Sequence, residues 1–346
     1  MNTLSTFLRS FAAALAVTIL LTGCGQDGGS SGQGETQLNM VTVNWIEGLA
    51  MTYMQEQIVE DSLGIEAGVK EVQGRGLAFS SVASGDRHFF NEAWLPTTHR
   101  ENWQKTKGSL QKLGYTYRGT SVGLAVPTYM EVDTITDLRA YRQALDGTIN
   151  GIEAGASINQ QTRQTLKKYG MDDEFSVLAA SGPATWQALE TAIQEKTPIV
   201  VVAWYPHWKW TEFDLKYVDG AHTGHNVDIW GYPEDIFTLV DNGFVERFPK
   251  DVVCFLKEFE VNDKQVLSLM SAFRNRGEAS KPEAAAQWIE NHPDAVSTWM
   301  EQTRACVASD TMPQPLPDSA AYSTRRAQKN DGASLHQPGD PLASGQ

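Results

Sequence analysis

The chain alternates short apolar runs with amphipathic stretches from residue 39 to about residue 307. Runs that are apolar, or that alternate with period two, predict strands at 39–45, 88–94, 121–129, 147–152, 175–179, 199–204 and 237–240. Apolar positions spaced by three or four residues predict helices at 48–62, 77–84, 158–169 and 183–194. This alternation is typical of the α/β class, in which helices connect the strands of a sheet.

The strand-and-helix pattern occurs twice, which together with a length of 346 residues indicates two globular lobes. The run at 199–204, IVVVAW, is almost wholly apolar, so we expect a parallel strand that is buried on both faces. After residue 240 the pattern predicts helices as far as Cys306, with Pro249, Pro282 and Pro293 near their starts.

The first segment has the features of an export signal. Arg9 precedes an apolar stretch at 11–21, which is shorter than the span of about 20 residues that crosses a bilayer. A membrane helix or a buried strand is the alternative. The residues before Cys24 resemble the bacterial lipoprotein signal, in which a lipidated cysteine becomes the mature N-terminus. We therefore expect a signal peptide at 1–23, a lipid anchor on Cys24 that holds the exported, periplasmic protein to a membrane, and a flexible tether at 24–37.

Charge and composition restrict the partners and the ordered part of the chain. Acidic residues outnumber basic ones by 42 to 28, giving a formal net charge of -14, so we expect no nucleic-acid partner. The segment 309–346 is rich in Pro, Ser, Gly, Asp and Gln and lacks apolar periodicity, which predicts a disordered tail.

Cys254 and Cys306 are the cysteines other than Cys24. An exported protein lies in an oxidising compartment, so the two are candidates for a disulfide. Closing a loop of roughly 50 residues would stabilise the fold by roughly 4 kcal/mol in the loop-entropy model. Two buried free thiols are the alternative.

Three tryptophans lie at or just beyond the ends of predicted strands, namely Trp45, Trp94 and Trp204. Ligands of open α/β sheets bind at strand ends. Each indole face attracts a cation with about 0.5 to 2 kcal/mol, and several faces around one pocket favour a diffuse onium charge. Packing in a hydrophobic core is the alternative for any one of the 10 tryptophans.

Other motifs carry less weight. Residues 119–123 fit the G-x-S-x-G pattern of hydrolases, but a strand-like segment follows the serine where that motif requires a helix. His222 and His225, with His207 nearby in the sequence, have no carboxylate or cysteine at ligand spacing, so we expect histidines of a polar loop and no metal site. No complete cofactor loop is present, and we expect no cofactor.

Four segments resemble the glycine betaine-binding proteins of ABC-type osmoprotectant importers. They are VNWIEGLAMTY (43–53), SVASGDRHFFNEAWLPTTH (81–99), GLAVPTY (123–129) and PIVVVAWYPHW (198–208), and they occur in the order usual for that family. The resemblance implies a two-lobed periplasmic-binding-protein fold of type II with the ligand in the cleft between the lobes. It further implies that lobe one comprises residues 38–123 plus 236–308 and that lobe two comprises residues 124–235.

In that family three tryptophans form a cage around the trimethylammonium group of the ligand, and they match Trp45, Trp94 and Trp204. Closure of the lobes completes such a site, because the closed form alone makes all the ligand contacts.

A histidine that matches His99 holds the ligand carboxylate in that family, together with backbone amides that correspond to Ser157 and Ile158. A Gly-containing turn that opens a helix near Ser157 presents free N–H groups to an anion, which supports this role.

The loop GIEAGASIN (151–159) departs from the family, which usually has Gly at the position of Ser157 and Met at that of Asn159. Ser157 either donates its hydroxyl to a carboxylate or caps the helix. Asn159 either contacts a polar ligand group or has no ligand role. Arg75, where the family is usually uncharged, is either an anion partner or a solvated surface arginine.

The resemblance implies a substrate-binding protein that delivers its ligand to the membrane permease of an ABC importer, and we expect a monomer without enzymatic activity. Glycine betaine is the expected ligand. Choline, proline betaine, carnitine and dimethylsulfoniopropionate are alternatives of the same class. An enzyme that acts on a betaine in the same cleft is the alternative from another class.

Overall fold

The computed structural model describes residues 35–317, and these residues belong to one compact unit. Its strands are β1 (Gln37–Val43), β2 (Glu66–Val72), β3 (Phe89–Leu95), β4 (Leu110–Pro127), β5 (Thr148–Asn150), β6 (Ser176–Leu178), β7 (Val201–Tyr205), β8 (Leu215–His222) and β9 (Glu234–Asp241). Its helices are α1 (Ile46–Ile58), α2 (Arg75–Ala83), α3 (Arg100–Thr106), α4 (Ser157–Lys168), α5 (Gly182–Glu195), α6 (Lys209–Glu212), α7 (Val227–Trp230), α8 (Phe244–Arg247), α9 (Lys250–Glu258), α10 (Asp263–Arg274), α11 (Lys281–Asn291) and α12 (Pro293–Val307). A π-helical turn (Val59–Leu63) extends α1, and a 3-10 segment (Ile135–Tyr141) follows β4.

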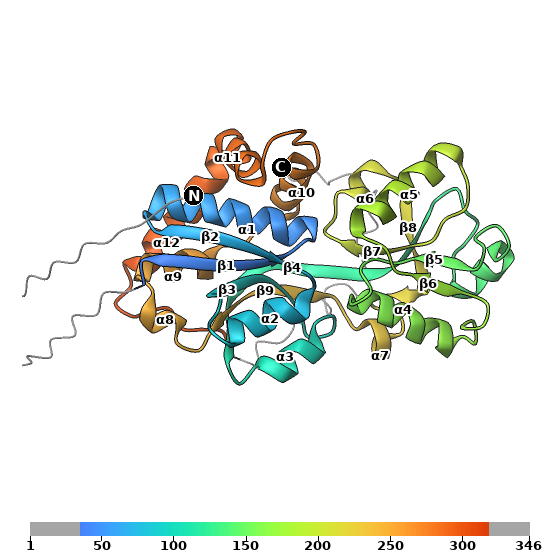
Figure 1. Cartoon of the computed structure of the whole chain (residues 1–346), viewed down its shortest axis with the longest axis horizontal. Helices are drawn as coiled ribbons and strands as arrows, with labels where there is room; N and C mark the ends of the chain where they lie inside the picture. The colour runs from blue at the N-terminus through green and yellow to red at the C-terminus, as the bar shows by residue number, and fades with distance from the viewer. Residues whose placement is uncertain (1–34, 318–346) are drawn as a thin grey trace, which may run out of the picture. The chain divides into compact units, whose positions relative to one another are not determined.

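The strands form a sheet in the order β2-β1-β3-β9-β4-β7-β5-β6, and β8 pairs with β4 beside this path. Parallel pairs lie at both ends of the order, whereas β9 and β4 pair antiparallel with their neighbours. The long strand β4 joins the two groups, because residues 110–120 pair with β9 and residues 121–125 pair with β7. Figure 1 shows β4 running from one group of strands to the other.

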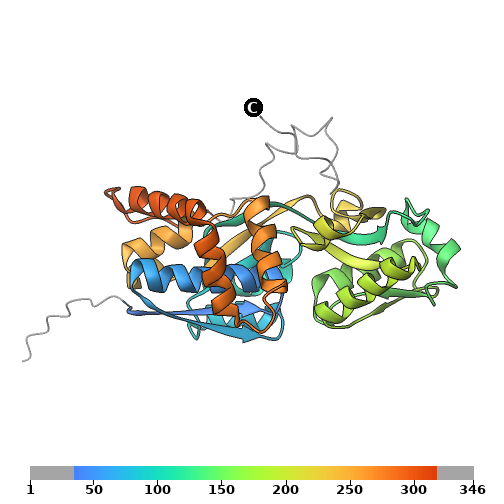
Figure 2. The same cartoon turned by 90° about the horizontal axis from the view of Figure 1, so that it is seen from above.

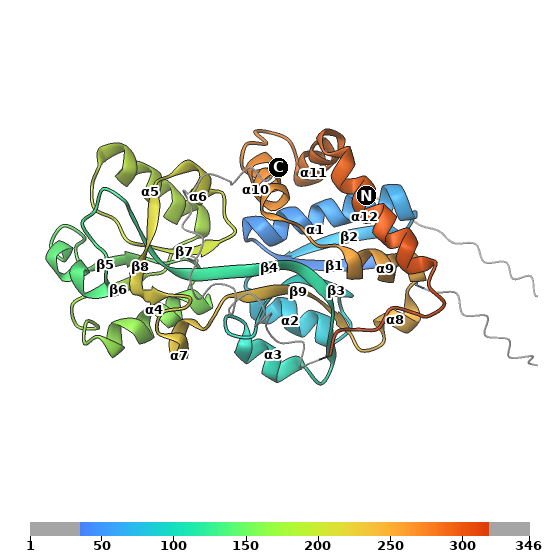
Figure 3. The ribbon, with the colours of Figure 1, turned by 180° about the vertical axis from the view of Figure 1, so that it is seen from behind.

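Strand β1 is buried on both faces. Leu38 and Met40 of β1 belong to the large apolar cluster that includes α1, whereas Val41 and Val43 pack in the cluster that includes Phe79 of α2. This is the alternation of a strand between two helical layers. Figure 2 shows α10 and α11 beside α1, and Figure 3 shows α9 and α12 from behind, in agreement with the contacts between these helices.

The predicted burial of residues 199–204 on both faces is confirmed. Val201 and Ala203 pack in a cluster with α5, and Val202 and Trp204 belong to the large cluster. The strand is not purely parallel, however, because β7 pairs parallel with β5 and antiparallel with β4.

The predicted strands and helices are present, with shifted ends, but the pattern missed β2, β8 and the first part of β4. β2 has the sequence EAGVKEV, lies at the edge of the sheet and buries none of its residues fully, so it lacks an apolar signal. β8 has the sequence LKYVDGAH, in which Asp219 and Gly220 interrupt the apolar alternation.

A disulfide joins Cys254 of α9 to Cys306 of α12, with 5.7 Å between their Cα atoms. It links two helices that also pack against each other. The bond closes a loop with a sequence separation of 52, so its main effect is to restrict the unfolded chain.

Two predicted boundaries at the ends of the ordered region are wrong. The tether was expected to continue to residue 37, but Glu35 pairs with Arg247 at 3.2 Å and β1 begins at Gln37. The disordered tail was expected from residue 309, but Leu316 donates its N–H to the carbonyl of Lys112 at 2.7 Å and packs against apolar side chains. Glu35 and Leu316 are fixed in place because their backbone N–H groups find acceptors, the carbonyls of Arg247 and Lys112.

The signal peptide, Cys24 and residues 318–346 lie outside the described residues. Every helix within residues 35–317 is too short or too polar to span a lipid bilayer.

Candidate functional site

One cavity brings together the six residues that the sequence singled out. It encloses about 390 Å³ of space between atoms, including the part that opens to solvent. The predicted residues that line it are Trp45, Trp94, His99, Ser157, Ile158 and Trp204. The lining residues that the sequence did not indicate are Glu47, Thr98, Val122, Ile152 and Ala156. The aromatic and apolar lining suits a small ligand with a hydrophobic surface.

The three indoles come from strand ends in both groups of strands. Trp45 follows β1 and precedes α1, Trp94 lies in β3 near its end, and Trp204 lies in β7. The indole N–H of Trp45 donates to the carboxylate of Glu153 at 3.4 Å, which orients the ring from a distant part of the chain. Aromatic faces held in this way can surround a diffuse positive charge.

His99 is buried and neutral. Its Nδ1 accepts the backbone N–H of Trp94 at 3.1 Å, so the ring proton of the neutral form is on Nε2. Burial, and in second place the positive charge of Arg75, hold the pKa of His99 well below its usual value. The ring lies 5.8 Å from that of Trp45 in a stacked arrangement. His99 therefore offers one N–H donor at the cavity without carrying a charge.

The loop before α4 contributes backbone amides. Helix α4 begins at Ser157, and the N–H groups of its first turn have no acceptor within the helix. These groups and the positive end of the helix dipole can hold an anion.

Ser157 does not cap this helix, because Ala156 occupies the N-cap and no side chain bonds there. Instead its hydroxyl donates to the carbonyl of Thr98 at 2.5 Å. Thr98 and Ser157 both line the cavity, so this bond joins two segments of its wall.

Asn159 is fully buried and supports the loop from inside. Its side chain accepts the N–H of Ile152 at 3.1 Å and donates to the carbonyls of Ile152 and Glu153. Among the two alternatives for this residue, the structure favours the absence of a ligand contact.

Arg75 is not a freely solvated arginine. Its guanidinium donates to the side chain of Asn102 at 2.7 Å and to the carbonyl of Gly155. The second bond connects α2 to the loop before α4, beside Ala156 of the cavity wall.

Three buried ionisable residues, Glu47, Glu92 and Lys209, interact with one another, and one of them lines the cavity. Glu47 lines the cavity, and burial raises its pKa to about 7. Burial and the charge of Glu47 raise the pKa of Glu92 well above its usual value. Burial lowers the pKa of Lys209 strongly, although the charge of Glu47 opposes this effect. Two buried carboxyls so coupled share protons, and one of them is at the cavity surface.

The residues of the hydrolase-like motif have another role. Ser121 lies within β4 and its hydroxyl is 3.0 Å from that of Tyr217, so it does not stand on a strand-to-helix turn. His207 is fully buried, and its ring lies 4.9 Å from that of Trp204.

Comparison with known proteins agrees with this geometry. The family described as the substrate binding domain of ABC-type glycine betaine transport systems matches residues 36–291. The glycine betaine/carnitine transport binding protein GbuC of Listeria monocytogenes is 34% identical over 160 residues, which are 46% of this chain and 51% of that protein. The chain thus spans about half the length of this curated relative.

Solved structures are similar over most of the chain. Lactococcal OpuAC, closed and in complex with glycine betaine, matches with a TM-score of 0.68 and 29% identity, covering 77% of this chain and 99% of that one. The glycine betaine/L-proline-binding protein ProX of Borrelia burgdorferi matches with a TM-score of 0.69 and 26% identity, covering 78% and 99%. These similarities confirm the α/β class and the two-lobed periplasmic-binding-protein fold.

Proposed function

Because the chain belongs to the family of substrate-binding domains of ABC-type glycine betaine transport systems, we propose that it binds glycine betaine or a closely related quaternary-ammonium osmolyte. It delivers this ligand to the membrane permease of an ABC importer. The observation that carries the proposal is the convergence of Trp45, Trp94 and Trp204 on one cavity.

The indole faces hold the onium head. A quaternary ammonium has no N–H groups, so it loses no hydrogen bonds when it leaves water. Its charge is spread over methyl groups that fit against aromatic rings. Glu47 adds a carboxyl to the same wall, and its ionised form, populated above a pKa of about 7, favours a positive ligand group further. An unmethylated ammonium would instead require hydrogen-bond acceptors to replace its water.

The carboxylate of a betaine binds at the other end of the cavity. The Nε2–H of His99 and the amides of Ser157 and Ile158 are donors for its oxygens. With about three cation–π contacts and two or three charge-assisted hydrogen bonds, less the cost of immobilisation, a micromolar Kd is expected, which corresponds to about -8 kcal/mol.

The cavity lies between two lobes, with residues 38–123 plus 236–308 in the first and residues 124–235 in the second. Both proposed boundaries fall inside strands, since β4 continues past residue 123 and β9 begins before residue 236. Two continuous strands would therefore act as the hinge, and ligand contacts made from both sides would favour closure.

A calorimetric panel tests the ligand. Glycine betaine, carnitine, proline betaine, choline and dimethylsulfoniopropionate are titrated, and glycine serves as the unmethylated control. We expect micromolar binding of at least one methylated onium compound and none of glycine. Binding of glycine with equal affinity, or of no onium compound, would contradict the proposal.

Choline is the second candidate, because the ionised form of Glu47 at the cavity, populated above a pKa of about 7, favours a ligand with net positive charge. Tighter binding of choline than of glycine betaine in the same panel would support it. Incubation with the bound compound, followed by NMR, distinguishes binding from turnover, and release of a product would support an enzyme.

Attachment to a membrane through lipid on Cys24 completes the proposal, with the monomer facing the periplasm. Replacing Cys24→Ala would release the exported protein into the soluble fraction. An unchanged membrane fraction in that variant would contradict the anchor.

A further inference from the structure

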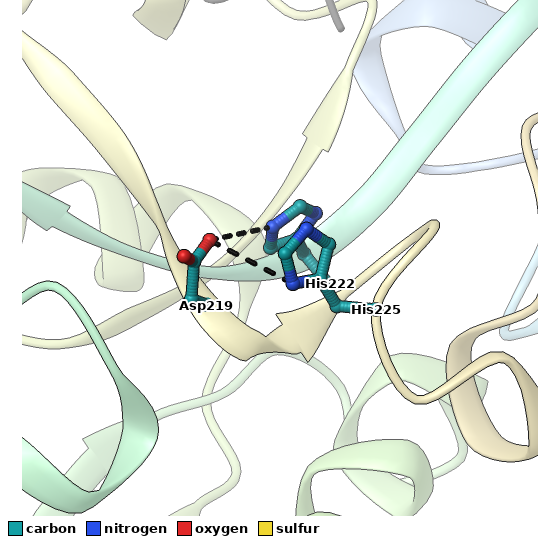
Figure 4. A group of neighbouring side chains, drawn as sticks. All are labelled: Asp219, His222 and His225. Atoms are coloured by element: carbon teal, nitrogen blue, oxygen red, sulfur yellow. Dashed lines mark hydrogen bonds and ion pairs between the residues drawn. The ribbon is translucent and has the colours of Figure 1, made fainter. Parts of the chain in front are cut away.

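Asp219, His222 and His225 form a cluster at the end of β8 (Figure 4), and these three residues are not among those that line the candidate cavity. The Oδ1 atom of Asp219 lies 3.4 Å from Nε2 of His222 and 3.8 Å from Nδ1 of His225. One potential ligand atom from each residue lies within 4.8 Å of the other two. The expectation that no carboxylate accompanies these histidines is therefore wrong, because Asp219 completes the set.

The backbone creates this cluster. In a regular strand, residues 219 and 222 would point to opposite faces, because side chains alternate. The register of β8 against β4 shifts in this segment, and Gly220 has a φ of 82°. A Cβ at Gly220 would lie 2.7 Å from the hydroxyl oxygen of Tyr169, so both conformation and space require glycine here. The irregularity directs Asp219 and His222 toward each other, as bulges often do at functional sites.

A tight turn adds the third residue. The N–H of His225 donates to the carbonyl of His222 at 2.9 Å, and the centroids of the two rings are 4.2 Å apart. His225 and Asp219 also line a surface hollow with Thr134, Tyr169 and Asn226. Small molecules and ions can thus reach the cluster from solvent.

The hydrogen bonds of His222 leave two acceptors facing each other, Nε2 of its ring and the carboxylate of Asp219. Its Nδ1 lies 2.7 Å from the carbonyl oxygen of Thr223, which can only accept, so Nδ1 carries the proton. In the neutral ring Nε2 then carries a lone pair, which faces the carboxylate of Asp219. A cation between the two lone pairs removes the conflict.

We propose that Asp219, His222 and His225 bind a zinc ion. Two imidazole nitrogens and one carboxylate oxygen suit Zn²⁺, whereas Mg²⁺ and Ca²⁺ prefer oxygen ligands alone. Bonds of about 2.0–2.2 Å in tetrahedral geometry place ligand atoms about 3.3 Å apart. The separation of 3.4 Å already fits, and rotation of the more exposed His225 brings its nitrogen into range.

The surroundings match an open, three-ligand site. The bond from Nδ1 of His222 to a carbonyl is the kind of support that orients zinc-binding histidines. The side chains of Asp219 and His225 are 59% and 40% exposed, so water or a small anion can take the fourth position. The next residue, Thr223, donates its N–H to the carbonyl of Val122 at 2.8 Å. The ion would therefore stabilise a turn that is hydrogen-bonded to β4.

Calorimetric titration of chelator-treated full-length protein with Zn²⁺ tests this site, with Mg²⁺ and Ca²⁺ for comparison. We expect one Zn²⁺ per chain and a higher Tm in its presence, without an effect of the other two ions. Asp219→Asn and His225→Ala change exposed side chains and should weaken zinc binding at least about tenfold. Asp228→Asn, an exposed carboxylate that pairs with Lys168, is the matched control and should bind as the wild type does.

Circular dichroism establishes that each variant is folded before titration. Zinc binding that is absent in the wild type would overturn the proposal. So would equal zinc affinity in the wild type, Asp219→Asn and His225→Ala, which would place the ion elsewhere. The result is independent of the osmolyte, because none is present in the titration.

Discussion

The ammonium group of Lys209 lies 4.2 Å from the centroid of the Trp204 ring and 4.1 Å from that of the Trp186 ring. Lys209 is fully buried, and within residues 35–317 its Nζ has no hydrogen-bond partner. Trp204 also lines the candidate cavity. The indole proposed to hold an onium ligand therefore already contacts a lysine of the protein itself, which adds a cation at this ring whenever Lys209 is protonated.

Replacing Lys209→Met tests the effect of this resident cation. The change removes the charge and keeps a long apolar side chain. Where Lys209 is protonated, we expect the Kd for glycine betaine to fall by about threefold to tenfold, because a like charge is removed and the Trp204 ring then attracts one cation instead of two. The free energy of unfolding should not decrease, since a buried charge without hydrogen bonds is costly. Calorimetry measures the first effect and urea unfolding the second. Lys168→Met, at an exposed lysine, is the control, and weaker betaine binding by Lys209→Met would contradict the interpretation.

Trp204→Leu keeps an apolar side chain and removes the π face. We expect betaine to bind at least about tenfold more weakly, because a desolvated cation–π contact contributes about 2 kcal/mol. Trp103→Leu is a matched control: Trp103 is 8% exposed and Trp204 7%, but Trp103 does not line the cavity. Calorimetric affinities of the two variants are compared. An equal loss of betaine affinity in both variants would attribute the effect to packing and would show that Trp204 does not contact the ligand.

His99→Ala separates the two ends of the ligand. The variant lacks the proposed Nε2–H donor, so we expect betaine to bind about tenfold to a hundredfold more weakly, the range for a hydrogen bond to a charged group. Choline has no carboxylate and should change much less. The ratio of the two affinities is the measurement, and it cancels any general loosening of the site. An equal loss for both compounds would assign His99 a structural role, through its bond to the N–H of Trp94.

Glu47 makes stability depend on pH. Its carboxyl has a pKa of about 7 in the folded protein against 4.5 for an ordinary glutamate, so folding takes up a proton between these values. The contribution is complete below pH 4.5 and is lost as the pH rises through about 7. Relative to Glu47→Gln, the wild type should lose up to about 3 kcal/mol of unfolding free energy across this window.

Urea unfolding of both proteins without ligand, at several pH values from 4.5 to 7.5, measures the difference. Glu278→Gln removes an exposed glutamate and should follow the wild type in parallel. A constant difference between the wild type and Glu47→Gln over the window would show that Glu47 titrates normally.

Much of the fold could be predicted, because a strand buried on both faces is a continuous apolar run in the sequence. Residues 199–204 are apolar throughout and were placed within a few residues of β7. The edge strand β2 could not be found in this way, because its burial depends on a single neighbouring strand. The cavity tryptophans could be proposed because they stand at strand ends in recognisable motifs.

The buried charges could not be assembled from the sequence. Glu47, Glu92 and Lys209 are far apart in the chain, and a lysine is ordinarily a surface residue. One signal was available: Glu92 lies in a strand whose residues are all buried, among Phe and Trp side chains. The ligand-like role of Asp219 was equally hidden, because it depends on the irregular backbone at Gly220.

Arg75 donates to the carbonyl of Gly155, and Ser157 donates to the carbonyl of Thr98, so opposite walls of the cavity are bonded to each other directly. If these walls belong to two lobes that move apart, as proposed, both bonds stabilise the closed arrangement. On that proposal, an osmolyte enters after these bonds have opened and leaves after they have broken. We therefore expect slower association and slower dissociation of the ligand than in a binding protein whose lobes contact each other only through the ligand.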